Sequence, residues 1–303
     1  MEKKIIIAGG TGFVGRHLTQ KFKSLGYEVI IISRQKDHVN WNNISAIEAA
    51  LENSEMLINL AGKSVDCRYN EKNKKEIYDS RIDTTKALGK AMLTCKYPPP
   101  LWINSSTATI YRHAEDRPMT ETAGEIGAGF SVNVASNWEK AFFGFTLPAT
   151  RQVALRMAIV LGKGGGVIDP LRNLVRFGLG GKQGRGNQMF SWIHIEDVFS
   201  IINFIQQHSE LSGVINTAAP NPVTNKSLMQ LLRINMGIKV GMPMPKWLLK
   251  IGAVFIKTET ELILKSRWVI PARLLEAGYQ FKYAVLDEAL KNILNDRVQK
   301  AIQ

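Results

Sequence analysis

Cysteine and long hydrophobic segments are both scarce in this chain of 303 residues. The two cysteines, Cys67 and Cys95, form neither a disulfide framework nor a spacing typical of metal ligands, so we predict no metal site. Apolar stretches such as 5–8 and 247–256, the second interrupted by Lys250, fall far below the roughly 20 residues that cross a bilayer. No apolar segment with a cleavage site follows the N-terminus, so we expect no signal peptide. These absences predict a cytoplasmic protein.

Acidic residues are also few, at 26 Asp plus Glu against 39 Lys plus Arg, which gives a formal net charge of +13. Such a balance suits nucleic-acid binding, but the cations are scattered and no recognised nucleic-acid motif accompanies them. We therefore interpret the charge as a solvated basic surface and predict neither a nucleic-acid nor a membrane partner. The apolar content of 45% is that of a globular protein.

What the sequence does contain is a regular alternation of buried strands and helices. A short apolar strand at 4–8 ends in glycines, a helix is expected over 11–25, and a second strand follows at 28–33. Further elements are expected at 46–51 (helix), 55–60 (strand), 72–95 (helix), 101–105 (strand), 133–143 (helix) and 149–160 (strand). This alternation predicts an α/β fold with a parallel sheet covered by helices on both faces.

A glycine-rich turn joins the first strand to the first helix, with glycines at positions 9, 12 and 15. Glycine lets the backbone turn tightly and approach a pyrophosphate, while the helix N-terminus offers unpaired N–H groups and a positive dipole end. The strand before and the helix after make this signal specific. The residues expected to contact a dinucleotide are Gly9, Thr11, Gly12, Phe13, Val14 and Gly15.

The end of the second strand distinguishes between the two nicotinamide cofactors. An enzyme that uses NAD usually places Asp or Glu there, to bind the ribose 2′-hydroxyl. This chain has Ser33 and Arg34 instead. Ser33 can donate a hydrogen bond to a 2′-phosphate, and Arg34 can form an ion pair with it. The alternative interpretation is that Arg34 is an ordinary surface loop residue with no role in cofactor binding. Its position directly after the strand favours NADP as the cofactor.

The domain organisation follows from where this alternation stops. We predict an NADP-binding Rossmann domain over 1–162, to which 187–218 returns with a helix and a strand. The glycine-dense segment 163–186 is expected to be a flexible loop. The remainder, 219–303, reads as a small, mostly helical C-terminal region on the substrate side.

Several further motifs resemble a known family. They are Asn59-Leu60-Ala61-Gly62, Ser80-Arg81, 105–111, Trp138-Glu139, Ser191-Trp192-Ile193-His194 with Asp197, Asn216 with 220–225, and 271–281. Together with the glycine turn, they resemble the extended short-chain dehydrogenase/reductases, and within these the "epimerase family protein" subgroup of the NAD-dependent epimerase/dehydratases. The resemblance covers essentially the whole chain. It implies a doubly wound Rossmann fold, an NADP cofactor, and cofactor contacts from Leu60, Ala61 and Gly62.

The resemblance also identifies where catalytic groups should lie. In the wider superfamily a Ser or Thr acts with a Tyr-x-x-x-Lys pair, and Thr107 falls at the Ser/Thr position. Ala135 and Glu139 occupy the Tyr and Lys positions, and neither can replace the missing phenol and ammonium. Tyr111 is a candidate acid, with packing at the strand end as the alternative. His194, just before a helix, is expected to be structural.

Two functions are consistent with this pattern. The first is an NADP-dependent oxidoreductase or epimerase acting on a small hydroxyl or keto compound whose identity the sequence does not supply. The second is a non-catalytic NADP(H)-binding sensor or regulatory protein, which the missing Tyr and Lys favour. A homodimer is compatible with both.

Overall fold

The computed structural model describes residues 3–245 and 265–294, and its centre is a parallel sheet. Seven strands are arranged in the order β10-β6-β5-β4-β1-β2-β3, all hydrogen-bonded in parallel. Their bounds are β1 Lys4–Ala8, β2 Glu28–Ser33, β3 Val39–Asn40, β4 Met56–Asn59, β5 Leu101–Thr107, β6 Arg151–Met157 and β10 Gly213–Thr217. This strand order is that of the Rossmann fold, so the predicted fold class is confirmed.

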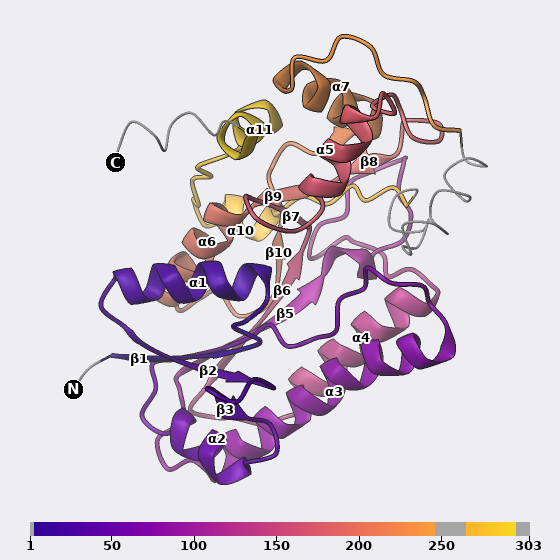
Figure 1. Ribbon diagram of the computed structural model, residues 1–303. Coiled ribbons are helices and arrows are strands. Elements are labelled where there is room, and N and C mark those ends of the chain that lie inside the picture. The colour runs from indigo at the N-terminus through magenta and orange to yellow at the C-terminus, as the bar shows by residue number, and fades with distance from the viewer. Residues whose placement is uncertain (1–2, 246–264, 295–303) are drawn as a thin grey trace.

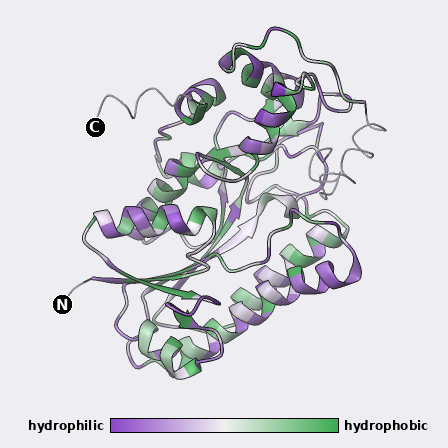
Figure 2. Cartoon of the chain, in the orientation of Figure 1, coloured by the Kyte–Doolittle hydropathy of each residue, from purple (hydrophilic) through white to green (hydrophobic). Residues whose placement is uncertain are grey.

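Helices cover both faces of this sheet (Figure 1). One face carries α1 (Phe13–Ser24) and α6 (Ile195–Gln207), and the other carries α2 (Ile44–Leu51), α3 (Glu71–Thr94) and α4 (Phe130–Phe143). The strands have two buried faces because their side chains alternate: in β1, Ile5 and Ile7 pack in one core and Ile6 and Ala8 in the other. Figure 2 shows β1 and β2 as largely hydrophobic, whereas α1 and α3 mix hydrophilic and hydrophobic residues.

The last part of the described chain forms a smaller, mainly helical region with its own core. Its helices are α5 (Ile168–Arg176), α7 (Asn225–Asn235), α10 (Ala272–Glu276) and α11 (Leu286–Leu294). Its strands make two small sheets, β7 (Ile159–Leu161) with β9 (Trp192–His194), and β8 (Met189–Phe190) with β11 (Val223–Thr224). Helices α5, α7 and α11 bury a shared apolar cluster. The predicted helical C-terminal region is therefore present.

One expected loop is not a loop throughout. The segment 163–186 contains α5, whose residues Ile168, Leu171 and Val175 are buried against the C-terminal core. Their spacing of three and four residues is that of one helix face, and the flanking glycines obscured it. The prediction of a flexible loop is therefore wrong over 168–176.

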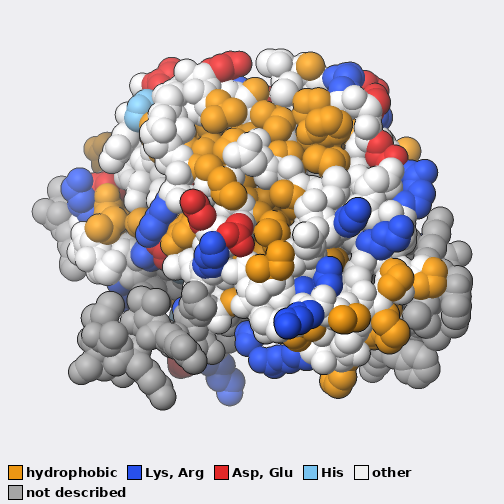
Figure 3. Space-filling model, turned by 90° about the horizontal axis from the view of Figure 1, so that it is seen from above, with side chains coloured by type: hydrophobic (Ala, Val, Ile, Leu, Met, Phe, Trp, Pro, Cys, Tyr) orange, Lys and Arg blue, Asp and Glu red, His pale blue; other side chains and the backbone are white. Residues whose placement is uncertain are grey.

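The apolar run 247–256 of the sequence lies outside the residues that the structure describes. Across 3–245 and 265–294, no helix is both long and apolar enough to cross a membrane. On the face drawn in Figure 3, hydrophobic side chains gather near the centre, and Lys and Arg side chains lie around them with few acidic groups.

The sheet's strand order reverses between β1 and β4, which lie side by side. In open parallel sheets, ligands bind in the crevice outside the carboxyl ends of the strands at this reversal. The glycine turn after β1 and residues 60–62 after β4 both lie there. The fold therefore places the expected cofactor residues at one edge of the sheet.

Candidate functional site at the carboxyl ends of the strands

The glycine turn is packed so closely that two of its positions exclude any side chain. A Cβ added at Gly9, which has φ +78°, would lie 2.8 Å from the Ala61 nitrogen, and one at Gly15 would lie 2.5 Å from the Gly9 oxygen. Gly15 therefore lets α1 pack against the turn, and Gly9 lets the turn approach the end of β4.

Gly12 differs from its neighbours because it faces open space. It is the N-cap of α1, and an added Cβ would meet only the Gly9 oxygen, at 3.5 Å. No side chain caps this helix and its first turn holds no acidic residue. The first-turn residues Phe13 and Val14 thus follow an uncapped, positively polarised helix end, which fits the pyrophosphate of a dinucleotide.

The Phe13 ring is covered by the glycine segment 162–166. Added Cβ atoms at Gly162 and Gly165 would lie 3.0 and 2.5 Å from ring atoms of Phe13, so only glycine lets the backbone lie this close. This contact joins the first turn of α1 to the segment leading into α5. Sequence reasoning recognised these glycines but not what they pack against.

The end of β2 shows how Ser33 and Arg34 divide their roles. Ser33 is buried, and its hydroxyl lies 2.9 Å from His38 Nδ1 and accepts a hydrogen bond from the Gln35 amide at 3.0 Å. Ser33 therefore shapes the turn after β2. Arg34 is exposed, with its guanidinium available to a ligand at this edge.

More positive charge lies beside Arg34, across the strand ends. Lys63 pairs with Glu76 and donates a hydrogen bond to Asn73 Oδ1 at 2.8 Å. The hydrogen bond from Lys63, together with the charges of Lys63, Lys72 and Arg34, lowers the pKa of the Glu76 carboxyl against the opposing effect of burial. The edge where a 2′-phosphate is expected is thus rich in cations.

A buried polar network supports residues 60–62 from below. Asn59 accepts a hydrogen bond from the Ala61 amide at 3.0 Å and donates to Thr85 Oγ1 at 3.1 Å and to Asn104 Oδ1 at 2.6 Å. Trp138 Nε1 donates to the same Thr85 hydroxyl at 2.9 Å. Side chains of β4, β5, α3 and α4 therefore hold this strand end rigid.

A cavity of about 140 Å³ opens beside Thr107, between α3, α4 and the end of β5. Its lining residues are Val65, Tyr69, Ile77, Arg81, Ser106, Thr107, Thr109, Phe130, Ser131, Val134, Ala135 and Trp138. Thr107 and Ala135, which the resemblance assigns to the Ser/Thr and Tyr positions, line the same space. The Thr107 hydroxyl caps the short 3₁₀ helix Ala108–Ile110 by accepting a hydrogen bond from the Thr109 amide at 3.1 Å.

Glu139 is the residue at the Lys position, and the structure explains how its charge is accommodated. Arg156 on β6 donates two hydrogen bonds to it, from Nε to Oε1 and from Nη2 to Oε2, each at 2.8 Å. Ser106 donates a third, at 2.6 Å. Burial lowers the pKa of Arg156, but the hydrogen bonds and charge of Glu139 outweigh it and leave that pKa raised. A buried ion pair with no net charge thus stands at the position that the resemblance assigns to the lysine. Sequence reasoning missed Arg156.

Tyr111 packs at the strand end and is absent from the cavity lining. Its hydroxyl donates to Asn216 Oδ1 at 2.8 Å and accepts from Arg156 Nη1 at 2.9 Å, and its side chain is buried. Burial raises the pKa of this phenol. The alternative role of Tyr111, packing at the strand end, is what its surroundings favour.

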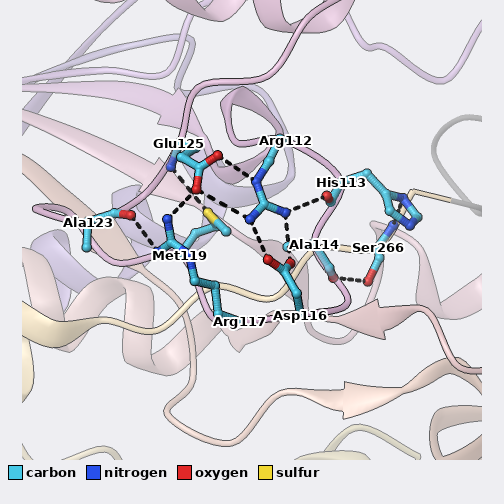
Figure 4. A network of polar contacts seen from close by, with 9 residues as sticks. All are labelled: Arg112, His113, Ala114, Asp116, Arg117, Met119, Ala123, Glu125 and Ser266. Atoms are coloured by element: carbon cyan, nitrogen blue, oxygen red, sulfur yellow. Dashed lines mark hydrogen bonds and ion pairs between the residues drawn. The ribbon is translucent and has the colours of Figure 1, made fainter.

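The loop that follows Tyr111 is held by a dense ion-pair network (Figure 4). Arg112 donates to Asp116 at 2.8 Å and to Glu125 at 2.9 Å, and Arg117 pairs with the same Glu125. Ser266 donates a hydrogen bond to the Ala114 oxygen at 2.5 Å. The network fixes loop 112–125, whose Thr120 oxygen also contacts the Tyr111 hydroxyl at 3.2 Å.

His194 and Asp197 anchor the C-terminal region to the start of α6. His194 Nδ1 accepts a hydrogen bond from the Glu196 amide, its ring stacks on Tyr283 with centroids 3.9 Å apart, and burial lowers its pKa to about 4. Asp197 accepts hydrogen bonds from the amides of Lys282 and Tyr283, at 2.8 and 3.0 Å. Both are structural, as predicted for His194. In the part of the chain that the structure describes, no cluster of three or more His, Cys, Asp or Glu could hold a metal.

Comparison with known proteins agrees with this geometry. Residues 5–128 match the model of the NAD dependent epimerase/dehydratase family, and 244–293 match a domain of unknown function (DUF1731). The chain is 35% identical to the epimerase family protein SDR39U1 of Mus musculus, over 96% of this chain and 99% of that protein. It is 32% identical to the epimerase family protein YfhF of Bacillus subtilis (strain 168), over 97% and 98%.

Solved structures give the same result. The crystal structure of human epimerase family protein SDR39U1 (isoform 2) with NADPH superposes with a TM-score of 0.88 at 32% identity, covering 97% of this chain and 99% of the human chain. The cofactor predicted here, NADP, is the one named for that relative. The resemblance stated from the sequence is confirmed: the chain belongs to the epimerase family proteins of the NAD-dependent epimerase/dehydratase family.

Proposed function

We propose that this protein binds NADP(H) and acts as an oxidoreductase or epimerase on a small hydroxyl or keto compound. The observation that carries the proposal is the arrangement at the sheet edge, where the open, uncapped N-terminus of α1 and the Thr107 cavity flank the same strand ends. The relative solved with NADPH supports the choice of cofactor. Arg34, exposed at the end of β2, is the residue that we expect to contact the 2′-phosphate.

The chemistry divides between the cofactor and the chain. When bound, the nicotinamide supplies or accepts a hydride at a carbon that bears oxygen. Thr107 holds that oxygen by a hydrogen bond from its hydroxyl, and the apolar side chains of Ala135, Val134 and Trp138 exclude water from it. Ala135 and Glu139 stand at the positions that the resemblance assigns to the catalytic Tyr and Lys, so we expect slow proton transfer and low turnover of simple carbonyl compounds.

The second candidate is a non-catalytic NADP(H) sensor or regulatory protein, and one observation favours it. At the position expected for the catalytic lysine, the Glu139 carboxylate is already engaged by Arg156 and Ser106, so it forms a buried ion pair in place of a free ammonium that could bind a ribose. Cofactor binding without turnover is the property that would distinguish this function.

Location and partners remain proposals of the same kind. We place the protein in the cytoplasm, with a small-molecule substrate, no nucleic-acid or membrane partner, and a homodimer as a further possibility. The proposal of no nucleic-acid partner rests on the sequence, in which no recognised nucleic-acid motif accompanies the basic residues.

Titration calorimetry and turnover assays test the proposal together. We expect the wild-type protein to bind NADPH more tightly than NADH. Once a substrate is found, Thr107→Val should slow turnover by about 10²-fold or more, whereas His194→Gln should have a smaller effect. Rapid turnover that survives the loss of both Thr107 and Tyr111 would show that the acid comes from elsewhere, and NADPH binding with no turnover of any carbonyl compound would favour the sensor.

A further inference from the structure

The cavity beside Thr107 contains one charged side chain among the described residues that line it, and this is Arg81 of α3. Its guanidinium is withdrawn from solvent between the end of β4 and the Trp138 ring. A Cβ added at Gly62 would lie 3.0 Å from Arg81 Cζ, and that carbon lies 5.2 Å from the Trp138 ring centroid. Arg81 is thus packed between the predicted cofactor edge and the aromatic wall of the cavity.

The hydrogen bonds of Arg81 leave most of its donors unused. Nη1 donates to the carbonyl oxygens of Lys63 at 3.1 Å and Ile77 at 2.9 Å. A guanidinium has five N–H donors, and those on Nε and Nη2 meet no acceptor within residues 3–245 and 265–294. None of the carboxylates described in those ranges pairs with Arg81.

Arg156, which lies at the same strand ends, differs from Arg81 in how its guanidinium is bound. Arg156 is more deeply buried than Arg81, and both edges of its guanidinium are engaged, by Glu139 and by the Tyr111 hydroxyl. Burial lowers the pKa of Arg81 to about 10, so the side chain is still charged at neutral pH. A largely desolvated guanidinium that pairs with no carboxylate in the described ranges is only partly compensated, and an anion that entered the cavity would supply the missing charge.

The shape and walls of the cavity indicate which anion. The volume of about 140 Å³ suits a compact molecule, and the Phe130, Val134, Ala135 and Trp138 side chains offer it apolar contacts. A guanidinium binds a planar carboxylate with two parallel hydrogen bonds, whereas a single cation among apolar walls is a poor match for a doubly charged phosphate. The Thr107 hydroxyl, on the same lining, can bind an oxygen beside the carboxylate.

We propose that this cavity binds a small hydroxy- or keto-carboxylate, with the Arg81 guanidinium as the partner of its carboxylate. The inference rests on the proposed NADP(H) site, because it assigns the substrate class of that same site. It goes further in requiring an anionic substrate.

Calorimetry on the NADP⁺-loaded protein tests this, because the oxidised cofactor has no hydride to give a keto acid. The probes are 2-oxobutyrate and 2,3-pentanedione, its neutral analogue of matched size. We expect 2-oxobutyrate to bind at least about 10-fold more tightly than the dione. Equal affinities, or no binding of 2-oxobutyrate at any concentration, would overturn the proposal.

Variants of Arg81 assign that preference to one side chain. Arg81→Met retains an unbranched side chain against Trp138 and should lose about 10-fold or more in 2-oxobutyrate affinity, while binding of the dione and of NADP⁺ changes less than about 3-fold. Arg81→Lys, which retains the charge and is the safer variant for folding, should recover part of the loss. Arg185→Met, at an exposed Arg paired with Glu115, makes the same change in net charge and should have no effect.

The outcomes separate this proposal from the proposed function. If Arg81→Met weakens NADP⁺ as strongly as 2-oxobutyrate, Arg81 serves the cofactor and the proposal is wrong. If it changes neither affinity, the carboxylate binds elsewhere and the proposal is also wrong. Failure of the wild-type protein to bind NADP⁺ would instead refute the proposed function, because that result does not depend on Arg81.

Discussion

Two regions flank the same strand ends, and they differ in how closely they follow the superfamily. The glycine turn at Gly9, Gly12 and Gly15 has the close backbone contacts that a dinucleotide site requires. On the other side of the crevice, Ala135 and the Glu139–Arg156 pair stand where a phenol and an ammonium are expected. The fold therefore retains cofactor geometry without the usual acid–base geometry, and each side can be tested separately.

The largest effect is expected from Gly12→Val in the glycine turn. The fold has room for the side chain, since an added Cβ meets only the Gly9 oxygen at 3.5 Å, but the space it fills is the one predicted for the pyrophosphate. We expect NADPH affinity to fall by about 10³-fold or more with little change in melting temperature. Fluorescence titration and thermal unfolding measure the two quantities, and normal NADPH binding would mean that the turn does not contact the cofactor.

On the opposite side, breaking the Glu139–Arg156 pair should affect stability. Glu139→Ala leaves a buried guanidinium without its carboxylate, and we expect a loss of about 3–5 kcal/mol in the free energy of unfolding. The double variant Glu139→Leu with Arg156→Met should recover most of that loss, because both charges are then absent. Urea unfolding measures each value.

The matched control is an exposed pair. Glu115→Ala removes the partner of Arg185, whose side chain is 74% exposed, and should cost no more than about 1 kcal/mol. A loss of similar size in Glu139→Ala would show that the buried pair has no special role in stability.

Arg34→Ala sharpens the comparison within the cofactor side. Loss of a guanidinium–phosphate contact should weaken NADPH binding by about 10- to 100-fold and leave NADH binding nearly unchanged, because NADH has no 2′-phosphate. Calorimetry with both cofactors provides the measurement. Equal losses for the two would show that Arg34 does not contact that phosphate.

The smallest effect is a pH dependence at His194. Its pKa is lowered to about 4 in the folded protein, below the ordinary value of 6.5, so between these values the unfolded state binds the proton that the folded state excludes. Stability from this residue is nearly complete above pH 7 and decreases as the pH falls toward 4, by about 1.4 kcal/mol at pH 5.5.

His194→Asn tests this sign, because Asn can still cap α6 without titrating. The variant should lose less stability than the wild type between pH 7 and 5 in thermal unfolding. Parallel pH profiles for the two proteins would mean that His194 does not contribute to acid destabilisation.

Local signals explain why much of the fold could be predicted. The strand at 4–8, the glycine turn and the helix after it are contiguous in sequence. Their order and spacing are therefore enough to predict a nucleotide-binding β-α-β unit. The helix at α5 was missed because the glycines on either side of Ile168 and Val175 resemble a loop, and only the C-terminal core shows which face is buried.

The catalytic side was less predictable, because its contacts join distant parts of the chain. Replacement of the Lys by Glu139 is visible in the sequence, but the pairing with Arg156 depends on β6 lying beside α4. In the sequence, Arg81 looks like a surface residue of a polar helix. In the structure, the Trp138 ring and the backbone that follows β4 lie against its guanidinium. Burial of polar groups by remote elements has no local sequence signal.

The contact between Phe13 and the glycines at 162–166 has a thermodynamic consequence. A ligand that fixes the first turn of α1 also fixes the surface against which Gly162 and Gly165 pack, and this segment leads directly into α5. Part of the free energy of cofactor binding is therefore linked to local opening of α5, and amide hydrogen exchange over 168–176 should slow when NADPH is added. The cofactor would then stabilise a helix of the C-terminal core through the contact between Phe13 and the glycine segment.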